Sequence, residues 1–413
     1  MDEGLLALLR ELVAIPSMNP YRADTLGPGY GEAAIAERVA AILREAGLAV
    51  ELQQIAPGRP NVLARLDGPQ GARPLLFVAH LDTVPVEGMT VPPFAGEVRE
   101  GRLYGRGACD NKGSLAAMLA ALRRVAAARS NPVPILFTAT ADEESGYGGI
   151  RAATAAAKSC GLRVASCGFG NSELGTRNSQ LLPRAGFVGE PTALRIVIAH
   201  RGVVRWAVAT HGKSAHSAHP EQGVNAIYRM APLVADLERL AGEIRRRPAH
   251  PLVGPPTLSV GTIHGGLTVN TVPDRCAIEV DRRLVPGESP DAAEAEARAV
   301  AERHGATLER FFAAGAFEVP PDCDAARMAV GAVEAVLGRA ETVGVAYATE
   351  APEVLAAGIP CVVVGPGDGS KAHSADEFIA LDQLEAAARV YEHLMTQPAP
   401  RILPSCPERT TPK

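Results

Sequence analysis

A histidine and an aspartate stand two residues apart at the end of an apolar run. His80 and Asp82 close the segment PLLFVAHLDT, which is typical of a buried strand. Since residues two apart in a strand point to the same side, Asp82 can hydrogen-bond one imidazole nitrogen of His80 while the other nitrogen faces a metal ion. Taken alone, such a pair is more often structural and merely ends a strand.

Further acidic residues lie at the ends of predicted elements. Asp110, in GRGACDNKGS, comes directly before a predicted helix, where a capping role alone would explain it. Asp142, Glu143 and Glu144 end the apolar run PVPILFTATADEE. An acidic run usually marks a solvated loop. At the end of a buried strand, however, the carboxylates repel one another, and a cation would offset that cost.

Glu190 in GFVGEPT and His373 in GPGDGSKAHSADEF complete a set of histidines and carboxylates that suits zinc. The 7 cysteines are scattered without C-x-x-C spacing, so neither a disulfide framework nor a thiolate zinc site is indicated. A reducing cytoplasm is then the simplest setting. Cys109, beside Asp110, is expected to be a small buried residue. The alternative is a metal-free cysteine hydrolase, which would be insensitive to chelators.

The elements that would position these residues change character along the chain. With 413 residues, two domains are expected. Short apolar strands alternate with helices at first, whereas longer alternating strands follow, with helices predicted over 224–246 and 290–304. We therefore predict an α/β fold, in which a catalytic domain of residues 1–194 and 312–413 has a mixed, mostly parallel sheet flanked by helices. An inserted α+β domain, residues 195–311, would have a four-stranded antiparallel sheet with two helices.

Composition and charge exclude several classes of protein. A formal net charge of −5 without a long Lys/Arg block argues against a nucleic-acid partner. The first residues place acids before an amphipathic helix, unlike a signal peptide, and no stretch approaches a membrane span. The Gly/Ser/Asn-rich segment 161–182 predicts a surface loop, and the proline-rich tail after Gln397 predicts disorder. A cytoplasmic enzyme that acts on a small molecule is expected.

Nearly the whole chain resembles the metallopeptidase and deacylase family that contains acetylornithine deacetylase, succinyl-diaminopimelate desuccinylase, glutamate carboxypeptidase and aminoacylase. The motifs that carry the resemblance occur in the family's order: HLDTVP, GRLYGRGACDNKG, ADEESG, GEPT, GKSAHSAHPEQGVNAI, NTVPD, DRRLVPGE and AHSADEF. The resemblance implies hydrolysis of an amide bond by a water that bridges two zinc ions. Cobalt or manganese could replace zinc, because such ligands accept several divalent ions.

The resemblance also implies a role for each matching residue. Asp110 would bridge the two metal ions, with the remaining ligands supplied by His80 and Glu190 at one ion and by Glu144 and His373 at the other. Glu143 would be the general base and Asp82 the partner of His80. His216 would reach the active site of a neighbouring subunit, which implies a homodimer joined through the inserted lid domain. Asn270 and Arg283 match positions that contact the substrate, the latter through its carboxylate.

Within this family the acetylornithine deacetylase branch is the most similar, through YATEAPEV, GEPTALRIVIAHRG and HSAHPEQGVNAI. The resemblance implies conversion of N2-acetyl-L-ornithine to L-ornithine and acetate, a step of arginine biosynthesis. Glu350 could pair with the cationic amine of such a substrate or simply cap the helix that follows it. Asn111, where that branch often has Met, and the long segment 161–182 leave the acyl group and the amine open. A desuccinylase, an aminoacylase or a dipeptidase of the same family are the alternatives.

A protein that keeps this scaffold but only binds a ligand is a rival of another class. Such a protein should lack a metal ligand or the general base. No such residue is missing from the motifs of this chain. The sequence therefore favours the enzyme.

Overall fold

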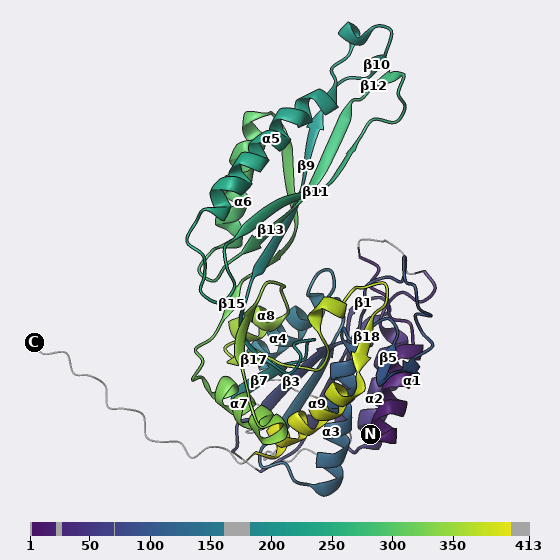
Figure 1. The fold of residues 1–413 in the computed structure, drawn as a ribbon, viewed down its shortest axis with the longest axis vertical. Helices are drawn as coiled ribbons and strands as arrows, with labels where there is room; N and C mark the ends of the chain where they lie inside the picture. The colour runs from purple at the N-terminus through teal and green to yellow at the C-terminus, as the bar shows by residue number, and fades with distance from the viewer. Residues whose placement is uncertain (1, 22–26, 70, 161–181, 398–413) are drawn as a thin grey trace, which may run out of the picture.

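The computed structural model describes residues 2–21, 27–69, 71–160 and 182–397. The loop predicted over 161–182, except for its last residue, and the predicted disorder after residue 397 lie outside these ranges. Figure 1 shows an elongated molecule made of a large unit and a small unit. Among the described helices, none combines the length and the apolar character needed to cross a membrane.

The large unit is built on a nine-stranded sheet. Its strands, in spatial order, are β1 (Ala49–Ala56), β2 (Arg59–Leu66), β6 (Ile135–Thr140), β3 (Leu75–His80), β7 (Ala185–Val188), β17 (Cys361–Val363), β8 (Ile196–His200) and β15 (Phe317–Glu318), with β16 (Thr342–Val345) also paired to β8. The central strands β6, β3, β7 and β17 run parallel, and antiparallel pairs flank them. Every residue of β3 and β6 is buried, as expected for parallel strands covered on both faces.

Helices cover this sheet (Figure 1). They are α1 (Glu3–Ala14), α2 (Ala33–Glu45), α3 (Lys112–Ala128), α4 (Gly148–Cys160), α7 (Asp324–Leu337), α8 (Ala351–Ala356) and α9 (Leu381–Thr396). The helix predicted directly after Asp110 is confirmed as α3, which connects β3 to β6 through the loop before it and packs on β3 and on α9. A small sheet of β4 (Glu97–Arg99), β5 (Arg102–Tyr104) and β18 (Phe378–Ala380) lies beside them. The mixed α/β class predicted from the sequence is confirmed.

The small unit is a four-stranded antiparallel sheet with two helices, as predicted. Its strands, in spatial order, are β11 (Thr257–Gly265), β13 (Arg275–Leu284), β9 (Gly202–His211) and β14 (Thr307–Ala314), and its helices are α5 (Ala226–Arg245) and α6 (Pro290–Arg303). Alternate residues of β9, among them Val204, Trp206 and Val208, are buried in a separate hydrophobic core under the helices. A short pair, β10 (Ala215–His216) with β12 (Thr271–Val272), forms the end farthest from the large unit (Figure 1).

The limits of the inserted domain remain a prediction. Residues 196–200 fall within the range predicted for it, yet they form β8 and pair inside the large sheet. At the other limit, β14 stays in the small sheet as far as Ala314. Sheet membership would therefore move the predicted boundaries to about residues 201 and 315, a few residues beyond 195 and 311.

Candidate metal centre and cleft

The carboxyl ends of neighbouring parallel strands bring the predicted residues together. β3 ends at His80 and β6 at Thr140, and these two residues are register partners. β7 lies on the other side of β3 and ends at Val188, just before Glu190. Because segments that leave parallel strands at one edge converge there, His80, the turn 142–144 and Glu190 meet at the same edge of the sheet.

Two groups of potential metal ligands share the carboxylate of Asp110. In the first group, His80 Nε2 lies 3.0 Å from Asp110 Oδ1 and 3.9 Å from Glu190 Oε1. In the second group, His373 Nε2 lies 3.4 Å from Asp110 Oδ2 and 3.1 Å from Glu144 Oε2. The ligand atoms of each group lie within 4.8 Å of one another. One imidazole nitrogen and two carboxylates at this spacing suit a divalent ion such as zinc.

The polar atoms of the first group fit a bound cation. Glu190 Oε1 is buried and has no hydrogen-bond partner among the described residues, although buried carboxylate oxygens normally have one. Burial raises the pKa of Glu190 well above its usual value, and the Asp110 carboxylate adds to this effect. His80 Nδ1 lies 3.0 Å from the Asp82 carbonyl oxygen. If Nδ1 donates its proton there, Nε2 presents a lone pair toward the two carboxylates, where a cation would offset their repulsion.

Asp82 fixes the turn that carries the glutamates. Its carboxylate oxygen Oδ1 is 3.6 Å from His80 Nδ1, too far for the hydrogen bond predicted between them, which the backbone carbonyl of Asp82 accepts instead. The carboxylate accepts hydrogen bonds from the backbone N–H groups of Glu143 and Glu144, each at 3.1 Å. Asn19 Nδ2 donates a third at 2.7 Å. Asp82 therefore positions both glutamates, a role that the strand periodicity did not indicate.

A buried ion-pair network supports the same turn from behind. Arg59 donates to both carboxylate oxygens of Glu32, at 2.6 and 2.9 Å, and to Asp142 Oδ1 at 3.0 Å. The backbone N–H of Asp142 donates back to Glu32 at 3.1 Å. Asp142 has a φ of 66°, a left-handed conformation that a non-glycine residue adopts when its surroundings hold it there. Sequence analysis missed Glu32 and Arg59.

Glu377 holds the loop of Asp110. Its Oε1 accepts hydrogen bonds from the backbone N–H groups of Cys109 and Asp110, each at 3.0 Å, and its Oε2 accepts one from Arg106 at 2.6 Å. Both charged side chains of this ion pair are buried. Glu377 belongs to the motif AHSADEF, so the motif signalled it, but its partner Arg106 is far away in the sequence.

Glu143 belongs to neither ligand group, yet it lines the same cavity. Burial raises the pKa of Glu143 well above its usual value; the nearby His80 ring opposes this effect, and the Glu190 carboxylate adds to it. A carboxyl group that stands beside the ligands and faces the cavity can accept and release a proton.

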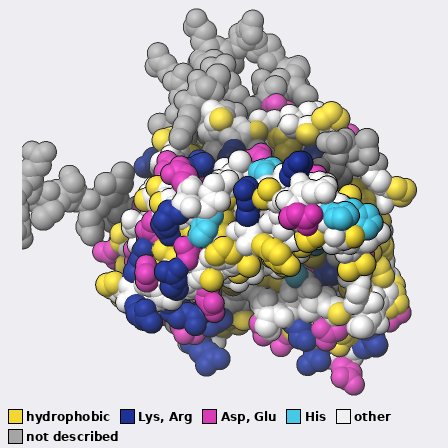
Figure 2. Space-filling model, turned by 90° about the horizontal axis from the view of Figure 1, so that it is seen from above, with side chains coloured by type: hydrophobic (Ala, Val, Ile, Leu, Met, Phe, Trp, Pro, Cys, Tyr) yellow, Lys and Arg dark blue, Asp and Glu magenta, His cyan; other side chains and the backbone are white. Residues whose placement is uncertain are grey.

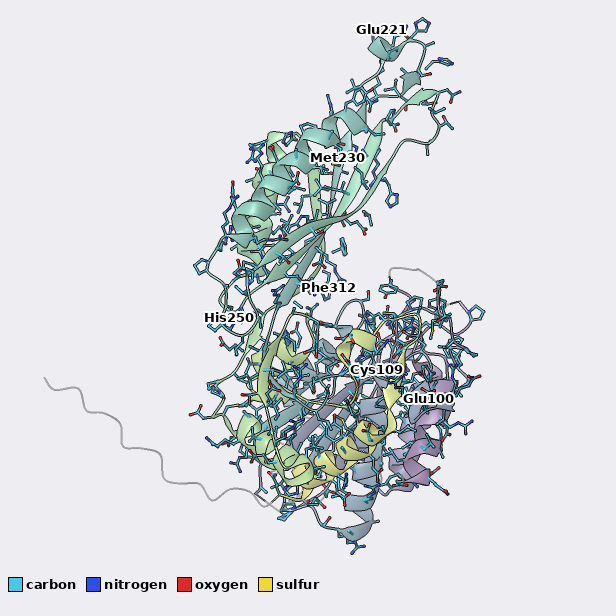
Figure 3. The ribbon with its side chains drawn as sticks, viewed as in Figure 1. Glu100, Cys109, Glu221, Met230, His250 and Phe312 are labelled. Carbon is cyan, nitrogen blue, oxygen red and sulfur yellow. The ribbon has the colours of Figure 1, made fainter. Side chains whose placement is uncertain are left out.

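The cavity has a volume of about 300 Å³ and lies between the two units. The large unit contributes the acids of both ligand groups and the rings of Tyr147 and Tyr347. The small unit contributes Arg283, whose contact with the substrate carboxylate stays a prediction. Figure 3 shows Phe312, another lining residue, where the small unit faces the large one. Sequence analysis missed several lining side chains: Tyr147, Val203, Arg205, Phe312 and Tyr347.

Five of the predicted site residues do not line this cavity: His80 and Asp82, described above, and three others. His216 and Asn270 lie at the distant end of the small unit, where His216 is exposed and its Nδ1 accepts a hydrogen bond from the backbone of Ala218. Glu350 is buried, and its Oε1 accepts a 2.5 Å hydrogen bond from the Thr140 hydroxyl. Its side chain makes no capping hydrogen bond to α8. Glu350 does occupy the N-cap position of α8, so both of its suggested roles stay predictions.

Cys109 is buried, and burial raises the pKa of its thiol far above the usual value, with the Asp110 carboxylate adding to the effect. A thiol held protonated is a poor nucleophile. This environment favours the small buried residue over the metal-free cysteine hydrolase.

Comparison with known proteins agrees with this site. The model of peptidase family M20/M25/M40 matches residues 76–397. The acetylornithine deacetylase of Proteus mirabilis is 32% identical over 398 residues, which cover 94% of this chain and 95% of that enzyme. The acetylornithine deacetylase of Photorhabdus laumondii is 31% identical over 403 residues, which cover 94% of this chain and 95% of that enzyme.

Solved structures share the fold. The M20 family metallo-carboxypeptidase Sso-CP2 from Sulfolobus solfataricus aligns with a TM-score of 0.77 at 19% identity, covering 96% of this chain and 99% of that one. The YXEP protein of Bacillus subtilis, described as a dinuclear metal binding peptidase, aligns with a TM-score of 0.60 at 17% identity, covering 95% of this chain and 96% of that one. With the family model matching most of the chain, this protein belongs to peptidase family M20/M25/M40 and is a hydrolase.

Proposed function

We propose that this protein is a metal-dependent amidohydrolase that converts N2-acetyl-L-ornithine to L-ornithine and acetate. The observation that carries the proposal is the Asp110 carboxylate shared by two ligand groups, with Glu143 free beside them in the cavity. The name acetylornithine deacetylase, borne by relatives that match nearly the whole chain, supports the choice of substrate.

We assign one zinc ion to His80, Asp110 and Glu190 and a second to Asp110, Glu144 and His373. Cobalt or manganese could substitute, since nitrogen and oxygen ligands do not select strictly among these ions. When bound, such a pair of ions polarises the substrate carbonyl and lowers the pKa of water. Asp82 and Glu377 keep the ligands in place through the hydrogen bonds described above.

Glu143 carries the proton in the proposed reaction. Its carboxylate takes a proton from the attacking water and passes it to the amide nitrogen, so that the amine leaves neutral. Arg283, on the opposite wall of the cavity, binds the substrate carboxylate. The rings of Phe312 and Tyr147, packed edge to face at 5.3 Å, form an apolar wall that limits the water around the reacting bond.

Zinc-loaded protein is expected to release ornithine from N2-acetyl-L-ornithine, and removal of the metals with a chelator should abolish the reaction until zinc is restored. The measurement is a colorimetric assay of the free amine, run in parallel on N-succinyl-diaminopimelate and on a set of dipeptides. Turnover of a succinylated substrate or a dipeptide, with none of acetylornithine, would transfer the assignment to another branch of the family.

One observation favours a second candidate, a deacylase of amino acids with uncharged side chains. Among the described residues that line the cavity, the acids are Asp110, Glu143, Glu144 and Glu190, all assigned above to the metals or to proton transfer. The δ-ammonium group of ornithine would therefore meet no spare carboxylate from this subunit. N-acetyl-L-methionine and N-acetyl-L-norvaline belong in the same assay, and a preference for them would favour this candidate.

We also propose a homodimer joined through the small unit. β11 is an edge strand of its sheet, and apolar side chains nearby are exposed, with Leu267 at 97% and Tyr228 at 77%. Figure 2, which views the molecule from above, shows apolar side chains beside histidines at the outer end of the small unit. Unpaired edges and apolar patches of this kind favour association. A dimer would also explain why His216 lies far from the cavity of its own chain, because His216 would then act in the active site of the other subunit.

Mixing two inactive variants tests this arrangement. The His216→Ala chain keeps an intact metal site with Glu143, and the Glu143→Gln chain keeps an intact His216. If His216 acts across the dimer, a refolded equal mixture should recover about one quarter of the wild-type rate, because half of the dimers are mixed and each has one complete site. A mixture that stays as inactive as its components, although sedimentation shows dimers, would show that His216 does not act across the dimer.

A further inference from the structure

The face of the small sheet that borders the cavity carries two arginines and one aspartate. Asp281 on β13 pairs across the strands with Arg205 on β9, and Arg283 follows Asp281 by two residues. Because alternate residues share a face and cross-strand partners lie side by side, these three side chains form one cluster. The intervening residues Trp206 and Arg282 are buried on the opposite side.

Asp281 holds both arginines by the same atom of each. Its Oδ2 accepts a hydrogen bond from Arg205 Nε at 3.0 Å, and its Oδ1 accepts one from Arg283 Nε at 2.7 Å. Within the described residues, the Nη1 and Nη2 atoms of both arginines donate no hydrogen bond. Since Asp281 binds only the Nε atoms, the Nη1 and Nη2 atoms of each guanidinium remain available to donate hydrogen bonds to a ligand.

A second contact fixes the Arg205 side chain. The Arg205 guanidinium carbon lies 5.5 Å from the centre of the Phe312 ring, and Phe312 packs edge to face against Tyr147. A guanidinium over an aromatic face is stabilised by cation–π attraction. Arg205 is therefore anchored at the cavity wall from two directions.

The charges of the cluster leave an excess of one positive charge. Two guanidinium groups stand against one carboxylate, and both arginines line the cavity, whereas Asp281 does not. The paired donors of a guanidinium match the two oxygens of a carboxylate. The wall formed by the small unit is thus suited to a single anionic carboxylate.

We propose that Arg205 is a second substrate-binding residue, which grips the α-carboxylate of the substrate together with Arg283, and that Asp281 is the positioning residue that orients both guanidinium groups. The inference rests on the proposed function and deepens it: the substrate class is an N-acyl amino acid with a free α-carboxylate. Amides and esters of that carboxylate bind poorly.

The test compares N2-acetyl-L-ornithine with its α-carboxamide. Arg205→Gln should raise KM for the carboxylate substrate roughly tenfold to a hundredfold, with kcat little changed, because a charge-assisted contact outside the reacting bond is lost. The same variant should leave KM for the carboxamide unchanged. Asp281→Asn should act in the same direction more weakly, and Arg205→Lys should restore part of the loss.

Arg310→Gln is the matched control. Arg310 lies on β14 of the same sheet and pairs with Asp291 and Glu294, away from the cavity. The Arg310→Gln variant should leave the KM of both substrates unchanged. A purely structural role of Arg205 would instead make Arg205→Gln change the KM of both substrates alike, and that result would overturn the inference.

The binding of both compounds is also measured calorimetrically in Glu143→Gln protein, so that the result does not depend on turnover. If neither that protein nor the wild type prefers the carboxylate, the inference fails, whether or not any N-acyl amino acid is hydrolysed.

Discussion

Glu143→Gln is expected to lower kcat by a factor of roughly a hundred to ten thousand, the usual contribution of a positioned general base, while both metals stay bound. The substitution keeps the size of the side chain but removes its capacity to take a proton. Glu143 is in neither ligand group, so metal binding should survive. Activity assays and metal analysis by mass spectrometry measure the two effects on the same preparation.

The neighbouring residue provides the control. Glu144 lies 3.1 Å from His373 and belongs to the second ligand group, so Glu144→Gln should lose activity together with about one metal ion per chain. The backbone N–H groups of both glutamates donate to Asp82, so both variants keep the turn. If Glu143→Gln also lost a metal ion, Glu143 would be a ligand and the proposed division of roles would be wrong.

The parts of the site that end buried strands could be predicted from the sequence. His80 and the turn of Glu143 and Glu144 each follow an apolar run, and parallel pairing of β3 with β6 places them together. The link between sequence and position is physical, since continuous apolar runs are typical of parallel strands, and the carboxyl ends of neighbouring parallel strands share an edge. Asp110 and His373 could be located only through the family resemblance, because a loop has no comparable periodicity.

The pairing of the supporting charges could not be predicted. Arg106 and Glu377 are 271 residues apart in the sequence, and Arg59 and Asp142 are 83 apart. On its own, each is a charged residue of the kind usually found on a surface, and only the fold shows that it is buried or partly buried beside its partner.

Glu350 is another residue whose side-chain contact could not be predicted from the sequence. Its place before α8 predicted a cap or a contact with substrate, but its side chain turns inward to Thr140 at the end of β6. Burial raises its pKa to about 7. The cavity wall offers other candidates for substrate selection. There the strand register of the small unit places Arg205, which no motif indicated, near Arg283, which the motif DRRLVPGE did indicate.

Asp110→Asn is expected to weaken the binding of both metal ions, whereas Glu190→Gln should weaken only one. The difference follows from the geometry, because Asp110 contributes Oδ1 to the group of His80 and Oδ2 to the group of His373. A neutral amide lacks the charge that a bridging ligand shares between two cations. Metal content after dialysis should fall from two ions per chain toward none in Asp110→Asn and toward one in Glu190→Gln, with activity lost in both.

Thermal unfolding gives an independent measure of the same difference. A ligand that binds only the folded state raises the unfolding temperature, so zinc should stabilise the wild type strongly and Asp110→Asn hardly at all. Without zinc, Asp110→Asn should be somewhat less stable than the wild type, because the substitution removes the charge that pairs with His373 and His80 and that keeps the pKa of Asp110 below its usual value. An Asp110→Asn protein that still bound one ion tightly, and gained full stability from it, would show that the two groups do not share this carboxylate.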